Sequence, residues 1–108
     1  MSQLEQLTAE QISFQLILHS GNARSKIIEA VRQYREGKAE DAERLLDEAE
    51  HDLSEAHHIH FHMIQKEAAG QRTEFSLLMM HAEDHLMSTM AMKELVKELI
   101  VLFKARNF

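Results

Sequence analysis

The chain has 108 residues with no cysteine, no proline, three glycines and a formal net charge of −6 at pH 7. The length predicts a single domain over residues 1–108, the composition is that of long helices in an all-α protein, and the negative charge argues against a nucleic-acid partner. The lack of cysteine, of a basic-then-apolar leader and of any run of 18 apolar residues predicts a cytoplasmic protein without direct membrane insertion.

The first helix is expected from about Ala9 to about Glu36. Thr8 and Gln11 have the spacing of a capping box, in which each side chain bonds the backbone N–H of the other residue. An apolar series at helical spacing follows them. Gly37 then suits the left-handed conformation that closes a helix without strain.

Gly21 and Asn22 interrupt this helix. A glycine inside a helix costs roughly 1 kcal/mol relative to alanine, so it indicates a kink or a close approach by another backbone. A helix–helix crossing at this point is the favoured interpretation.

The second helix is expected from Ala39 to Gly70. Its small and apolar residues follow a strict 3-4 repeat, which is typical of a coiled-coil seam, and its many alanines predict unusually close helix packing. The seam consists of Ala39, Ala42, Leu46, Ala49, Leu53, Ala56, His60 and Met63. His60 is its polar member and is predicted to turn inward.

Four histidines gather between His57 and His62. His58 and His62, four residues apart, could share a metal ion. The alternative is that His57, His58 and His62 lie on or near a solvated face. The second interpretation is preferred because no cysteine or carboxylate completes a ligand set.

The third helix is expected from about Glu74 to Lys104, with Thr73 as its cap. Three helices joined by two tight turns predict an up-down-up antiparallel bundle. Each helix of about 30 residues is roughly 45 Å long, which gives a rod with much side surface and little interior. Such a rod gains stability by associating with copies of itself.

An apolar stripe on the third helix turns polar for three turns and then apolar again. Burying these polar groups without partners costs several kcal/mol, so the sequence predicts a functional reason for them. The stripe consists of Leu77, Leu78, His81, Asp84, His85, Ser88, Met92, Leu95, Leu99, Leu102 and Phe103. Methionines occupy the opposite side of the same turns, so we expect both sides to be covered.

Three interpretations of His81, Asp84 and His85 remain open from the residues alone. The histidines could be neutral core residues, one of them paired with Asp84. They could bind zinc with Asp84, although nothing else marks an open coordination position or an activating base. A neutral imidazole nitrogen could instead attack a phosphoryl group. Because the chain has no GxxxxGK loop, that group would have to arrive on another protein.

Three separated motifs resemble one known family. The run from His81 to Met87, HAEDHLM, resembles the signature of the lactose/cellobiose-type enzyme IIA proteins of the bacterial phosphoenolpyruvate-dependent sugar phosphotransferase system. Gly21 to Ser25, followed by Glu29 and Ala30, resembles the helix-one motif of that family. Its helix-two end is matched by Ala56 and His57 together with the run from Ile64 to Gly70.

The resemblance implies a phosphoryl relay rather than a stand-alone enzyme. In that family the first signature histidine accepts the phosphoryl group from the phosphohistidine of HPr. It then passes the group to a cysteine of the IIB component, which phosphorylates the sugar during uptake through the IIC membrane permease. Carried over, His81 is the phosphorylated residue. Cellobiose, lactose and chitobiose remain open as the β-disaccharide, and a non-catalytic helical adaptor or metal-binding bundle is the alternative function.

The resemblance also implies a homotrimer of coiled-coil-like bundles. The signature aspartates of that family meet on the threefold axis, where a divalent cation such as Mg²⁺ sits, and Asp84 takes that position here. His85 could bond near the phosphoryl group or fill the trimer core. His60 and Glu83 stand where the family has glutamine, and Glu83 is expected to point outward because its charge would repel a phosphoryl group. Gly21 and Asn22 are the remaining candidates for the shell of the site.

Overall fold

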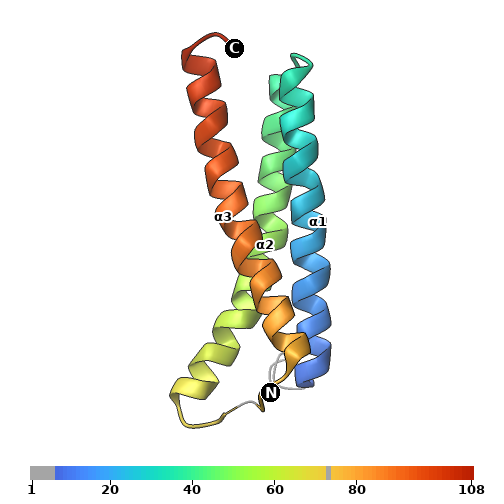
Figure 1. Cartoon of the computed structure of the whole chain (residues 1–108), viewed down its shortest axis with the longest axis vertical. Helices are drawn as coiled ribbons and strands as arrows, with labels where there is room; N and C mark the ends of the chain where they lie inside the picture. Colours follow the sequence, from blue (N-terminus) through green and yellow to red (C-terminus); the bar gives the residue numbers. More distant parts are fainter. Residues whose placement is uncertain (1–6, 73) are drawn as a thin grey trace.

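A computed structural model describes residues 7–72 and 74–108 as three long helices. These are α1 (Ala9–Arg35), α2 (Ala39–Ala68) and α3 (Leu77–Ala105), and the described part of the chain contains no strand. They run up, down and up, so the C-terminal end of α2 and the N-terminal end of α3 both lie at the bottom of the molecule (Figure 1). The rod measures 51 × 23 × 20 Å, so the predicted all-α, up-down-up bundle is confirmed.

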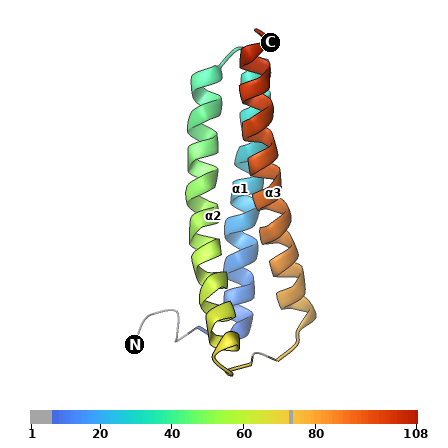
Figure 2. The same ribbon diagram turned by 90° about the vertical axis from the view of Figure 1, so that its left-hand side faces the viewer.

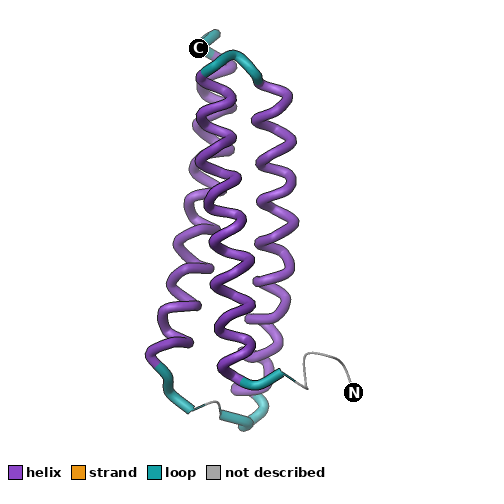
Figure 3. The backbone as a smooth tube through the Cα atoms, turned by 90° about the vertical axis from the view of Figure 1, so that its right-hand side faces the viewer, coloured by secondary structure: helices purple, strands orange, loops and turns teal. Residues whose placement is uncertain are grey.

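The start of α1 and the ends of α1 and α2 follow the predicted signals. Thr8 Oγ1 accepts from the Gln11 N–H at 3.1 Å, and the Gln11 side chain accepts from the Thr8 N–H at 2.9 Å, which confirms the capping box. Gly37 and Gly70 have φ of 83° and 92°, the left-handed region that glycine adopts without strain. Each follows its helix within two residues, and loops join the helices at both ends of the rod (Figure 3).

The predicted start of α3 is wrong by three residues. Ser76, in extended conformation, is the N-cap, and its Oγ accepts from the Met79 N–H at 2.9 Å. Glu74 therefore precedes the helix, and Thr73, the predicted cap, lies outside the described residues. Serine and threonine cap helices almost equally well, so the choice between two such residues depends on the path of the loop rather than on local preference.

α1 forms the spine of the bundle, because it packs against both other helices while α2 and α3 contact each other least (Figure 2). Small residues line the contacts, as predicted from the alanine seam. Those with no exposed surface are Ala23, Ala30, Ala42, Ala49, Ala56 and Ala82. Within this chain the predicted close approach at Gly21 is wrong, because α1 continues through it and an added Cβ would meet nothing within 4 Å.

Ion pairs join α2 and α3 near the end where α3 stops. Glu50 lies 3.4 Å from Lys93 Nζ and 3.5 Å from Lys97 Nζ, and Glu43 pairs with Lys104. The two ammonium groups hold the pKa of the Glu50 carboxyl below its usual range. Toward the other end the two helices diverge before the chain turns between them (Figure 1).

Candidate functional site

The buried face of α3 lies opposite the predicted stripe. The described residues of α3 that are buried are Met79, Ala82, Leu86, Thr89 and Ile100. At 100° per residue this face points away from His81 and Asp84, which are both exposed. Within the single chain the predicted stripe therefore does not pack against the other two helices. The helix is apolar nearly all round, and the small Ala82 and fully buried Leu86 fit best against the other two helices.

The structure brings His81 and His85 together on successive turns. Their ring centroids are 4.9 Å apart, and the rings meet edge to face with an interplanar angle of 77°. His81 is exposed, whereas His85 is half-buried and its Nδ1 has no hydrogen-bond partner among the described residues. His81 is thus the accessible imidazole, and His85 is placed to support one side of its ring.

Asp84 is also exposed on α3, one residue before His85 and four before Ser88. Ser88 Oγ donates to the backbone carbonyl of Asp84 at 2.7 Å, which turns the hydroxyl back onto the helix. The carboxylate of Asp84 has no ion pair with another described residue. One exposed acid with no partner is suited to a cation or to a neighbouring molecule.

Arg24 is a residue that sequence reasoning did not single out beyond its place in the motif from Gly21 to Ser25. Its Nη2 donates to Ser88 Oγ at 2.8 Å and its Nε to Thr89 Oγ1 at 3.3 Å. It therefore fastens α1 to α3 one turn beyond Asp84. Asn22 is exposed and forms no side-chain hydrogen bond with the described site residues.

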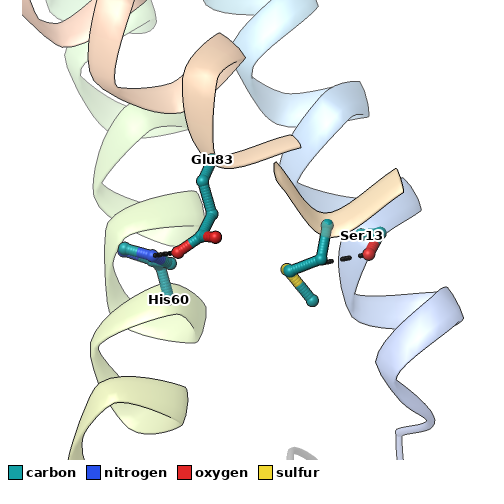
Figure 4. Close-up of polar contacts among 4 residues, drawn as sticks. Ser13, His60 and Glu83 are labelled. Atoms are coloured by element: carbon teal, nitrogen blue, oxygen red, sulfur yellow. Dashed lines mark hydrogen bonds and ion pairs between the residues drawn. The ribbon is translucent and has the colours of Figure 1, made fainter. Parts of the chain in front are cut away.

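His60 and Glu83 form a short polar contact between α2 and α3. The His60 side chain is 10% exposed, and its Nε2 lies 2.6 Å from Glu83 Oε2 (Figure 4). An ionised carboxylate only accepts hydrogen bonds, so His60 carries a proton on Nε2 in this contact. The inward orientation predicted for His60 is confirmed. The outward orientation expected for Glu83 is wrong, because the imidazole gives its carboxylate a partner across the helix interface.

A cavity of about 240 Å³ opens beside this pair, where α2 and α3 diverge. Apolar side chains from both helices line it together with the carboxylates of Glu67, Glu74 and Glu83. Its rim continues into exposed apolar residues at the start of α3, namely Phe75, Leu77 and Met80. This end of the bundle therefore has a cavity lined by both apolar side chains and carboxylates.

The histidines of α2 do not gather around one point. His57 stacks on Phe61, with ring centroids 6.2 Å apart, and both His57 and His58 are exposed. His62 is half-buried and faces the N-terminal end of α1 instead. Over residues 7–72 and 74–108 no three histidine or acidic side chains come together as a metal site.

The pair of His60 and Glu83 predicts a coupled effect on stability. His60→Ala and Glu83→Ala should each lower the free energy of unfolding by about 1–3 kcal/mol, because each leaves a partly buried partner without its hydrogen bond. The double variant should lose less than the sum, because it leaves no unpaired partner behind. Urea unfolding of the four proteins measures this, with Glu55→Ala on the exposed side of α2 as the control. Additive losses would mean that the contact does not bridge the helices.

Comparisons with known proteins agree with this geometry. Residues 11–104 match the family described as "PTS system, Lactose/Cellobiose specific IIA subunit". The oligo-beta-mannoside-specific EIIA component of Bacillus subtilis is 68% identical over 94% of this chain and 92% of its own length. The lichenan-specific enzyme IIA component of the same species is 48% identical over 88% and 86%.

Two solved structures share the bundle. The cellobiose-specific enzyme IIA from Bacillus anthracis has a TM-score of 0.83 and 44% identity, with 99% of this chain and 94% of that chain covered. The IIA component in the IIA(chitobiose)–HPr complex of Escherichia coli has a TM-score of 0.76 and 31% identity, with both chains fully covered. At these identities and coverages the likeness extends to the sequence as well as to the fold.

Proposed function

The chain belongs to the lactose/cellobiose-specific IIA family of the sugar phosphotransferase system, and we propose that His81 is the residue that carries the phosphoryl group. Phospho-HPr is the proposed donor and a cysteine of the IIB component the proposed acceptor. The observation that carries this proposal is the exposed imidazole of His81 within the motif HAEDHLM, edge-on to a second histidine.

The proposed chemistry needs only an accessible imidazole nitrogen and a docking surface. A neutral nitrogen of His81 attacks phosphorus, a new P–N bond forms, and the P–N bond of phospho-HPr breaks. In the second transfer a thiolate of IIB attacks the same phosphorus and the His81 P–N bond breaks. Exposed methionine and aromatic side chains around His81 can repack against two differently shaped partners, and a IIA relative has been solved in complex with HPr.

We further propose a homotrimer built around the exposed stripe of α3, which we define as Leu77, His81, Asp84, Ser88, Leu95 and Leu102. All six residues are exposed in the single chain. At 100° per residue Asp84, Leu95 and Leu102 fall within about 20° of one line, with His81 about 60° to the side. Copies packing along this line would cover the leucines and leave His81 at the margin, where a partner protein can reach it.

A divalent cation, Mg²⁺ in our proposal, fits this assembly but not a single chain. One chain offers one carboxylate in the stripe, and its described residues form no cluster of three ligating side chains. Copies of Asp84 from several chains would supply the carboxylate oxygens that Mg²⁺ prefers. The cation would neutralise these charges where the assembly buries them.

For the sugar we propose a β-linked di- or oligosaccharide. Relatives at 68% and 48% identity are named for oligo-beta-mannoside and lichenan, and a solved structure at 44% identity for cellobiose. The lactose-specific relatives are 36–38% identical. The higher identities favour a system for gluco- or manno-oligosaccharides over a lactose system.

Incubating the purified chain with phosphoenolpyruvate, enzyme I and HPr tests the relay. We expect the intact mass to rise by one phosphoryl group, and peptide mapping at neutral pH to place it on the peptide that contains His81. Omission of HPr is expected to prevent the modification. A folded helical chain that gains no mass would contradict the proposal and favour the non-catalytic helical adaptor.

A further inference from the structure

A second cavity lies at the base of the bundle, between the first turn of α1, the last turns of α2 and the turn that follows them. It has a volume of about 190 Å³, and Ala9, His62, Lys66, Gln71 and Arg72 are among the residues that line it. A water molecule occupies about 30 Å³, so the space exceeds what a few ordered waters fill. It can hold a small polyatomic anion with part of its hydration shell.

The charge of this cavity is opposite to that of the chain. Lys66 and Arg72 line it, whereas none of the acidic side chains that the structure describes does, and yet the whole chain has a formal net charge of −6. Among the described residues neither Lys66 nor Arg72 has an ion-pair partner. Glu67 and Glu74 line the separate cavity next to His60 instead. Two positive charges and an amide thus share one recess on an acidic protein.

His62 also lines this cavity and is half-buried there. Its Nε2 has no accessible surface and no hydrogen-bond partner among the described residues, so the charges that face a bound molecule are those of Lys66 and Arg72.

The backbone around the cavity is held in place on both sides. The Gln71 N–H donates to the Lys66 carbonyl at 2.9 Å, which folds the turn carrying Arg72 back against α2. Ala9 is the first residue of a 27-residue helix whose N-terminal dipole favours negative charge. A basic residue in the last turn of a helix is expected for the dipole alone, which accounts for Lys66 but not for Arg72 or His62.

From the cavity and its positive charge we propose that the base of the bundle binds a phosphate group, either as inorganic phosphate or as the phosphate monoester of a small molecule. Guanidinium and ammonium groups bind phosphate oxygens through charge-assisted hydrogen bonds. The site is distinct from His81 and goes beyond the proposed relay, since it needs no covalent step.

Backbone amide NMR of the full chain tests this proposal. At pH 7 and constant ionic strength, inorganic phosphate should shift the amides of Ala9 and of residues 62–72 along saturable curves. Lys66→Gln or Arg72→Gln should weaken binding about tenfold, the loss expected from one charge-assisted hydrogen bond. Lys38→Gln, which removes the same charge at the opposite end of α2, should leave the affinity unchanged.

Further titrations distinguish inorganic phosphate from a phosphate ester, and the phosphate site from the proposed relay at His81. Tighter binding of glucose 6-phosphate than of inorganic phosphate would identify a phosphate ester, and equal binding would identify the free ion. His81→Ala should bind phosphate as the parent chain does. Equal shifts with chloride, or equal weakening by Lys38→Gln and Lys66→Gln, would overturn the proposal and leave only general charge screening.

Discussion

His81→Ala is expected to abolish phosphoryl transfer through this protein while leaving the bundle folded. In the proposed relay the His81 nitrogen is the atom that takes up the group, so its removal should lower the rate of transfer to IIB by about 10⁴-fold or more. His81 is exposed, and alanine is a good helix former, so the free energy of unfolding should change by less than about 0.5 kcal/mol. Mass spectrometry and thermal unfolding measure the two quantities.

Two other histidine variants make this result specific. His57→Ala changes an exposed histidine on α2 and should leave uptake unchanged. His85→Ala should still accept the phosphoryl group, at a rate that reports the support its ring gives to His81. Uptake retained in His81→Ala but lost in His85→Ala would show that the wrong histidine has been assigned as the nucleophile.

Leu95→Lys is expected to convert the proposed trimer into monomers. Leu95 is 61% exposed in the single chain and lies at the centre of the exposed stripe of α3. Each copy would bring an unpaired ammonium into an apolar interface, which costs several kcal/mol per charge before mutual repulsion is added. Sedimentation should find three times 12.5 kDa for the parent chain and 12.5 kDa for the variant.

Val101→Lys is the matched control for this experiment. Val101 is 62% exposed on the same helix, but at 100° per residue it lies about 120° from the stripe. The same chemical change there should leave the trimer intact. Adding a chelator tests for the cation. Loss of the cation should leave the Asp84 carboxylates to repel one another and should therefore weaken the assembly. A parent chain that is monomeric with and without chelator would contradict the threefold assembly.

Local chemistry explains which parts of the fold are predictable from the sequence. The start of α1 follows from a reciprocal pair of side chains three residues apart, and the ends of α1 and α2 follow from glycines that take positive φ. The start of α3 depends on the loop before it, which contains two residues able to cap. A helix end is therefore predicted correctly when residues next to it determine it, and less well when it depends on the path of a loop.

The sequence of α3 alone does not predict which side of this helix packs inside the chain. Because α3 is apolar on several sides, its sequence pattern does not decide which side packs inside the chain and which side another molecule covers. The contact of Glu83 with His60 joins residues 23 positions apart on different helices. Neither position signals the other along the sequence, so the sequence does not predict that His60 is the partner of Glu83.

More ion pairs hold α2 to α3 near one end of the bundle than near the other, and this difference affects local unfolding. The end where α3 stops has the contacts of Glu43 and Glu50 with three lysines, whereas the end with His81 depends on His60 and Glu83 beside an open cavity. Amide hydrogens in the first turns of α3 should therefore exchange with solvent faster than those near Ile100. Such a gradient keeps one end of the rod fixed, while the end with His81 fluctuates enough to fit the two proposed partners, HPr and IIB, in turn.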